Sequence, residues 1–318
     1  PDALDLRMED DAAGFLGIDL KRHTEGGLKG CIELLQIGLI DKIIRSTGLQ
    51  DASTKERPAI AILGKDEDGE PNCEKWKFSS IIGMMMYLST NSRCDISFAV
   101  HQAARFNHNP KRSHEQAIKQ IVKYLKGTRD RGMIIRTHSK KDKKLRLDCW
   151  VDADYAGAFS VEDKMDPICA KSRTGYVLTL GDTPVVFTSK LQTKTAISTM
   201  EAETIALAQS MRDLLPMRRL IGEIKEVWTD IPIHHQSTIW EDNNACLKFA
   251  KSGDLPKFTP RNKHFAVEVY WFLENIGNEP DSDIIINRVE SENQRADPLT
   301  KPTEVKDFKH KRKLLMGW

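Results

Sequence analysis

The stretch WVDADYAG, Trp150–Gly157, ends a strand-like pattern with two aspartates. From Leu145 onward, apolar residues alternate with other residues, and this period of two is typical of a half-buried strand. Leu147 and Val151 fall on one side of the extended chain, and Asp152 falls on the other. The sequence therefore predicts a core strand with a carboxylate at its exit.

The strand pattern continues beyond this stretch and then mixes with helical patterns. A long helix is expected from about Thr199, kinked or interrupted at Pro216, and a last helix is expected near Asp297. Two more helices fall between 243 and 276. The five strand patterns lie at 145–154, 174–180, 184–189, 237–242 and 283–289. This order predicts an α/β fold, with a mixed five-stranded sheet flanked by helices.

Helical patterns dominate the first part of the chain. A short strand signal, GFLGIDL, occupies Gly14–Leu20, and 51–71 reads as a polar loop. The segment SKKDKKLR, Ser139–Arg146, has the composition of a charged linker. Helices are expected at 37–49, at 113–127, and as a pair within 78–106 that is separated near Asn91.

Basic residues concentrate in one segment. Between Arg105 and Arg146 there are 14 Lys/Arg and 3 Asp/Glu, a local charge of +11 in a chain of net charge +2. Such a belt indicates a polyanionic partner, although a solvated lysine-rich surface is the alternative. In the helix at 113–127, lysines lie opposite the apolar stripe. The candidate phosphate contacts are Lys111, Arg112, Lys119, Lys123 and Lys126.

Composition excludes some protein classes. At 318 residues the chain is long enough for two domains, and it has no apolar run of membrane-spanning length and no secretory signal. Its six cysteines lack paired spacing, which favours reduced thiols in a cytosolic or nuclear compartment. The first residue is Pro1, which suggests a fragment or a processed product.

Four acidic residues fall at the ends of expected elements, and each has a structural explanation. Asp152 could be a surface residue where its strand leaves the core. Ser198 and Glu201 match a capping box. Asp242 precedes a helix as an N-cap would, and Asp297 precedes a proline, which is a common helix start.

Taken together, the four carboxylates indicate a metal site. If the strands that end at Asp152 and Asp242 are neighbours, their ends meet at one edge of the sheet. Carboxylates gathered there repel one another unless a cation neutralises them, and Mg²⁺ or Mn²⁺ prefers oxygen ligands. Two such ions, roughly 4 Å apart, can activate water and stabilise a leaving oxygen in phosphodiester hydrolysis.

Several long motifs resemble the ribonuclease H domain of copia-type (pseudovirus) retrotransposon Pol polyproteins. They are VDADYAG, KSRTGYVLTLGDTPVVFTSKLQTKTAISTMEAE, WEDNNA, RNKHFAVEVYWF and NQRADPLTKP. Upstream, YLSTNSRCDISFAVHQAARFNHNP and SHEQAIKQIVKYLKGT resemble the thumb and connection of the same family's reverse transcriptase, and the final FKHKRKLLMGW resembles the polyprotein's C-terminus.

The resemblance covers nearly the whole chain and implies a division into five parts. The expected fold is a ribonuclease H-like sheet preceded by a mostly helical region. The parts are the end of the reverse transcriptase palm with the start of the thumb (1–70), a helical thumb/connection region (71–138), a charged linker (139–144), the ribonuclease H domain (145–302) and a C-terminal tail (303–318).

The resemblance also implies roles for individual residues. Two Mg²⁺ or Mn²⁺ ions would be bound by Asp152, Glu201, Asp242 and Asp297. Asp154 and Glu203 are near misses beside these positions. His264, in NKHF, matches a family position and is a candidate nucleic-acid contact, with a histidine packed at a helix start as the alternative. The loop at 158–170 is enlarged relative to the shortest family versions.

The implied activity is endonucleolytic hydrolysis of the RNA strand of RNA–DNA hybrids. The expected partners are the hybrid duplex and the rest of the Pol polyprotein, with no membrane, in a cytoplasmic virus-like particle or the nucleus. A polymerase needs paired aspartates in a strand-turn-strand, and the sequence around Asp10 and Asp11 does not have that pattern. We therefore expect no DNA synthesis by this chain alone. A non-catalytic nucleic-acid-binding or structural fragment of a larger polymerase is the alternative. An integrase or transposase fits poorly because the glutamate among its acidic site residues comes last in the chain, whereas here the glutamate comes second.

Overall fold

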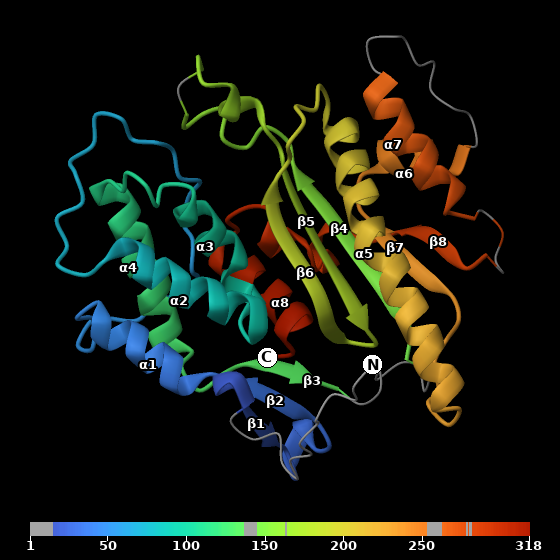
Figure 1. The fold of residues 1–318 in the computed structure, drawn as a ribbon, viewed down its shortest axis with the longest axis horizontal. Coiled ribbons are helices and arrows are strands. Elements are labelled where there is room, and N and C mark those ends of the chain that lie inside the picture. The colour runs from blue at the N-terminus through green and yellow to red at the C-terminus, as the bar shows by residue number, and fades with distance from the viewer. Residues whose placement is uncertain (1–14, 137–144, 163, 253–262, 278, 280–281) are drawn as a thin grey trace, which may run out of the picture.

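A five-stranded mixed sheet forms the centre of the C-terminal half (Figure 1). The computed structural model describes residues 15–136, 145–162, 164–252, 263–277, 279 and 282–318, so the predicted linker 139–144, Asp10 and Asp11 lie outside the described residues. The strands run in the spatial order β6-β5-β4-β7-β8. They are β4 (Leu147–Asp154), β5 (Arg173–Leu180), β6 (Thr183–Leu191), β7 (Ser237–Glu241) and β8 (Ile284–Arg288).

The first strand of this sheet, β4, is its centre. It pairs antiparallel with β5 and parallel with β7, and β7 pairs parallel with β8. Because β4 and β7 are parallel neighbours, their carboxyl ends lie at the same edge. The predicted mixed five-stranded α/β sheet is confirmed.

Helices α5 (Thr199–Val227), α6 (Asn244–Ser252) and α7 (Lys263–Glu274) cover one face of the sheet (Figure 1). The apolar side of β4 packs there, as the alternation predicts. Of the two predicted effects of Pro216, a kink or an interruption, the interruption does not occur, because α5 continues through the proline. Leu214 and Ile221, on either side of the proline, are buried in the same core and hold both halves against the sheet.

Helix α8 (Val305–Met316) covers the opposite face and lies between the sheet and the N-terminal helices (Figure 1). The last helix, expected near Asp297, is instead a 3₁₀ turn (Asp297–Leu299) followed by α8. Leu315 packs in a cluster with Val177 of β5, whereas Phe308 lies in the core of the N-terminal helices. The segment predicted as a tail, 303–318, is therefore a packed helix that joins two cores.

The N-terminal part contains the expected helices and an unexpected sheet. The helices are α1 (Ile37–Ser46), α2 (Phe78–Asn91), α3 (Ser97–Ala104) and α4 (Arg112–Gly127). The second sheet, in the order β1-β2-β3, comprises β1 (Asp19–Arg22), β2 (Ile32–Leu35) and β3 (Met133–Ile135). The strand signal at Gly14–Leu20 is only partly correct, because Leu16 and Gly17 have φ angles of 54° and 71° and form a turn before β1.

The enlarged loop at 158–170 also joins the two parts. Its Glu162 accepts hydrogen bonds from the backbone N–H of Lys65 at 2.9 Å and from the Arg105 guanidinium at 2.7 Å. The Glu162 side chain is buried in this contact. The loop therefore contacts the N-terminal helical part directly. Among the described residues, no helix combines the length and apolar character needed to cross a membrane.

The packing of α8 makes a prediction about stability. Phe308 is 4% exposed, so Phe308→Ala should lower the free energy of unfolding by about 3–5 kcal/mol in chemical denaturation, through lost burial and a residual cavity. Val227→Ala, at a residue 74% exposed, is the control and should change the free energy by less than about 0.5 kcal/mol. Equal small effects from both variants would show that 303–318 is a loosely attached tail.

Candidate metal centre

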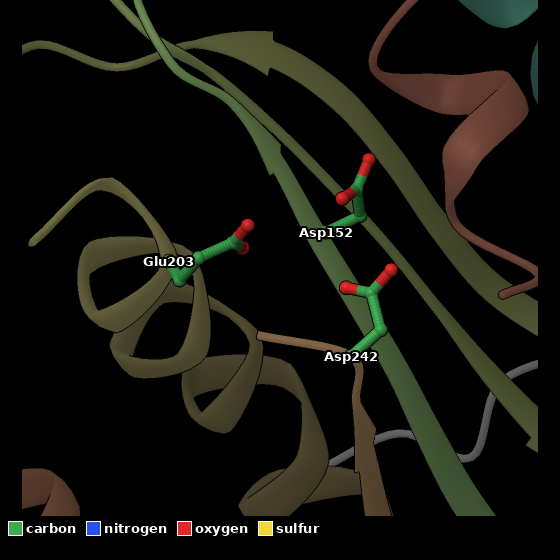
Figure 2. Close-up of side chains that lie close together, drawn as sticks. All are labelled: Asp152, Glu203 and Asp242. Atoms are coloured by element: carbon green, nitrogen blue, oxygen red, sulfur yellow. The ribbon is translucent and has the colours of Figure 1, made fainter. Parts of the chain in front are cut away.

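Three carboxylates converge at the edge where β4 and β7 end. Asp152 lies in β4, Asp242 directly follows β7, and Glu203 projects from the first turns of α5 towards both aspartates (Figure 2). Each offers an oxygen, and these oxygens all lie within 4.8 Å of one another. Asp152 and Glu203 are 2% and 3% exposed, so the cluster is largely removed from bulk solvent.

The strand register explains why the two aspartates meet. The parallel ladder pairs Trp150 with Trp240, and Asp152 and Asp242 each lie two residues beyond that pair. The N-cap explanation for Asp242 does not apply here. Asn243 fills that role instead, because its Oδ1 accepts hydrogen bonds from the backbone N–H groups of residues 245 and 246 at 2.9 and 3.1 Å. The Asp242 carboxylate is left for the cluster and for Ser291, whose hydroxyl donates to it at 2.7 Å.

The structure places Glu203, and not the predicted Glu201, in this cluster. The Glu201 side chain is engaged at the start of α5 instead. Its carboxylate accepts a hydrogen bond from the backbone N–H of Ile197 at 2.9 Å, while the Ser198 hydroxyl accepts from the Glu201 N–H at 3.1 Å. This resembles a capping box, except that Glu201 accepts from the backbone N–H of the residue before the N-cap, Ser198, and not from that of Ser198 itself. Residues two apart on a helix point about 200° apart, so Glu203 faces the aspartates when Glu201 caps the helix.

The sequence contains a signal that would have identified Glu203. Glu203 lies four and seven residues before Leu207 and Ser210, so it belongs to the same side of α5 as these buried residues. A lone acid on the buried side of a helix is costly unless it has a partner or a function. The capping pattern and the family motif both gave more weight to Glu201.

Asp297 is near the cluster but is held by two lysines. Lys301 Nζ lies 2.9 Å from Asp297 Oδ1 and 3.7 Å from Asp152 Oδ2. Lys311, from α8, donates to Asp297 Oδ2 and also to Asp307 at 2.9 Å. The structure therefore places Asp297 beside Asp152, as predicted, but outside the group of three that could share one ion.

A glycine allows this close approach. Asp152 pairs with Gly175 across the β4–β5 ladder. A Cβ at Gly175 would lie 2.5 Å from Thr300 Cγ2 and 3.2 Å from the carbonyl oxygen of Ala296. Without that Cβ, the 296–300 segment packs on the sheet, and the Thr300 hydroxyl donates a hydrogen bond to Asp152. The glycine of the KSRTGY motif thus helps to place both Thr300 and Asp297.

Burial and crowding change the acidity of the cluster. Burial, and then the negative charge of Asp297, raise the pKa of Asp152 to about 7. Burial and the neighbouring Glu241 raise the pKa of Glu203 well above its ordinary value. Burial also acts to raise the pKa of Asp297, but Lys301 and Lys311 outweigh it and lower that pKa. The Asp152–Glu203–Asp242 group therefore has an unmet need for positive charge.

This donor set fits a hard divalent cation. It consists only of carboxylate oxygens, the ligand type that Mg²⁺ and Mn²⁺ prefer. Glu203 Oε2 is buried without a hydrogen-bond partner among the described residues, as is Oε2 of the adjacent acid Glu241. Buried carboxylate oxygens of this kind are rare without a compensating cation. The predicted cofactor class therefore fits the residues present.

The other near miss, Asp154, lies outside the group of three. It follows Asp152 by two residues in β4, and its pKa is raised chiefly by burial. Its carboxylate packs against Gly157, where an added Cβ would lie 1.7 Å from Asp154 Oδ2.

Most of the predicted phosphate-binding cations already contact the polar segment 51–77. Four of the five make such contacts: Lys111 with the Glu67 and Gly69 carbonyls, Arg112 with Glu70, Lys119 with Glu74 and Lys126 with the Ala52 carbonyl. The cationic side of α4 is therefore less available than the sequence suggests, and nucleic-acid binding by these residues stays a prediction. His264 belongs to α7, but its side chain lies outside the described residues.

The raised pKa of Asp152 predicts how stability depends on pH without metal. Its pKa is about 7 when folded and takes the ordinary value of 3.8 when unfolded, so its contribution to stability is present below 3.8 and is lost as pH rises through about 7. With EDTA present, the free energy of unfolding of the parent should fall relative to Asp152→Asn over that range. A difference between the two proteins that stays constant with pH would contradict this assignment.

Known proteins are similar to this chain over nearly its whole length. No family model matches it. It is 30% identical over 293 residues to the Retrovirus-related Pol polyprotein from transposon RE1 of Arabidopsis thaliana, covering 91% of this chain and 18% of that protein. It is 28% identical over 307 residues to the corresponding polyprotein from transposon TNT 1-94 of Nicotiana tabacum, covering 94% and 21%.

Solved ribonuclease H structures also resemble part of the chain. LC11-RNase H1, isolated from compost by a metagenomic approach, is 17% identical, with a TM-score of 0.33 over 49% of this chain and 92% of that one. The chain spans about a fifth of the length of the two curated relatives. Their similarity extends over more than nine-tenths of its residues, so the chain is homologous to a segment of the copia-type Pol polyproteins of plant transposons.

Proposed function

We propose that this chain hydrolyses the RNA strand of RNA–DNA hybrids, as the ribonuclease H part of a Pol polyprotein. One observation carries the proposal: Asp152, Glu203 and Asp242, from three separate elements, place oxygens within 4.8 Å of one another in a largely buried site. Folding brings such charges together at a cost that a bound cation offsets. Acidic residues that only cap helices or end strands, in contrast, have no reason to converge on one place in the fold.

Asp152, Glu203 and Asp242 would hold the divalent ions, with Asp297 as the nearest additional carboxylate. Bound Mg²⁺ or Mn²⁺ supplies Lewis-acid chemistry, which activates water and stabilises the leaving oxygen of a phosphodiester. The contribution of the chain's own residues is to hold these carboxylates in position. The hydrogen bonds that Glu201 and Ser198 make fix the first turn of α5 and so the direction of Glu203, and the Thr300 hydroxyl orients Asp152.

The proposed substrate and setting follow from the family. An enzyme of this type distinguishes RNA from DNA through the 2′-OH and the groove shape, not through base sequence. The rest of the Pol polyprotein would supply further duplex contacts and the polymerase active site. The proposed setting is a virus-like particle in the cytoplasm, or the nucleus.

The two glutamates of STMEAET provide a matched test. Glu203→Gln, Asp152→Asn and Asp242→Asn should each lower the rate of Mg²⁺-dependent RNA cleavage in a hybrid by about a hundredfold or more, because each removes a charged ligand worth several kcal/mol to the transition state. Glu201→Gln should retain most of the activity, since glutamine also completes a capping box. Rates come from cleavage of an end-labelled hybrid under single-turnover conditions.

The opposite pattern, loss with Glu201→Gln and retention with Glu203→Gln, would show that the metal ligand is the glutamate chosen from sequence alone. Full cleavage by Asp152→Asn would overturn the proposed site altogether.

A non-catalytic nucleic-acid-binding fragment is the second candidate. The observation that favours it is the pair of lysines, Lys301 and Lys311, that already neutralise part of the acidic site. Such a fragment would bind hybrids in a salt-sensitive way. It would show no stabilisation by Mg²⁺ or Mn²⁺, whereas the nuclease would be stabilised by either ion.

A further inference from the structure

The two lysines at the acidic site differ in how they are held. Lys311 is 6% exposed and bonds to both Asp297 and Asp307, so carboxylates of two neighbouring segments enclose it. Lys301 is 40% exposed. Its ammonium lies 2.9 Å from Asp297 Oδ1.

Lys301 is also the cation that reaches the proposed metal ligands. It lies 3.7 Å from Asp152 Oδ2, and its positive charge acts on Asp242 as well. Its only ion-pair partners among the described residues are Asp152 and Asp297. A half-exposed lysine has a long flexible side chain that can leave such a site for water without any movement of the backbone.

We propose that Lys301 is an exchangeable counter-ion, which neutralises the acidic site without metal and is displaced when a divalent cation binds. The inference rests on the proposed function, because it requires Asp152 to be a metal ligand. Lys311 stays bound to Asp297 in both states, and it thereby keeps the site attached to α8.

Repulsion between the Lys301 ammonium and a bound divalent ion is the physical reason for the displacement. An ammonium within about 4 Å of a carboxylate ligand stands close to any divalent ion on that ligand, where like charges repel by several kcal/mol in a partly shielded site. The ion and the ammonium therefore compete for Asp152. Without metal, the lysine limits the repulsion between Asp152 and Asp297, which would otherwise destabilise the fold.

Removing the ammonium should therefore have opposite effects on the two states. We expect Lys301→Met to lower the melting temperature in EDTA and to tighten Mn²⁺ binding by about tenfold, measured by isothermal titration calorimetry on the full chain. Lys301→Arg retains a cation and should bind Mn²⁺ about as the parent does. Lys309→Met, which removes a lysine paired with Glu56, is the surface control and should not change Mn²⁺ affinity.

The outcomes separate this inference from the proposed function. If the parent binds Mn²⁺, Asp152→Asn does not, and Lys301→Met binds no more tightly than the parent, then Lys301 is not a competing ion and only the metal site stands. If the parent binds no Mn²⁺ at this site, both ideas fail. Tighter binding by Lys301→Met but not by Lys309→Met supports the exchange.

A second measurement uses the parent chain and so does not depend on a variant folding. Amine-specific labelling followed by mass spectrometry should show that Mn²⁺ increases labelling of Lys301 severalfold, because the ammonium is released from its carboxylates. Lys311, which stays enclosed, is the internal control and should remain protected. Unchanged labelling of Lys301 at saturating Mn²⁺ would overturn the proposal.

Discussion

Electrostatic repulsion among buried carboxylates is the constraint around which this site is built. Asp152, Glu203, Asp242 and Asp297 gather near one sheet edge with little water to screen them. The surrounding structure reduces the cost by several means: Thr300 donates to Asp152, and two lysines bind Asp297. No lysine forms an ion pair with Glu203 among the described residues, and burial raises the pKa of its carboxyl well above the ordinary value.

The same constraint connects the site to the rest of the molecule. Lys311 lies on α8, which also carries Phe308 into the core of the N-terminal helices. Helix α8 therefore contacts the acidic site, the sheet and the helical part at once. The loop at 158–170 makes a second connection through Glu162 and Arg105. Asp297 is therefore linked through α8 to the packing of the N-terminal helices.

Much of the fold could be predicted from the sequence because its elements have strong periodicity. The alternation in β4 correctly identified the side that packs in the core beneath the helices, and the ends of β4 and β7 gave Asp152 and Asp242. Prediction was poorer where two local patterns compete. Glu201 satisfies a capping box, whereas the burial of Glu203 shows only once α5 is placed on the sheet. The lysines around Asp297 come from a turn and a distant helix, and no local pattern predicts such a contact.

The central claim is that Asp152, Glu203 and Asp242 bind a divalent cation together. A crystal structure of the chain grown with Mn²⁺, with anomalous diffraction to locate the ion, tests this most directly. We expect an anomalous peak among these three carboxylates, with Glu201 still capping α5 and the Lys301 side chain turned away from Asp152. A peak coordinated by Glu201, or an acidic edge that stays free of Mn²⁺ at saturating concentration, would contradict it.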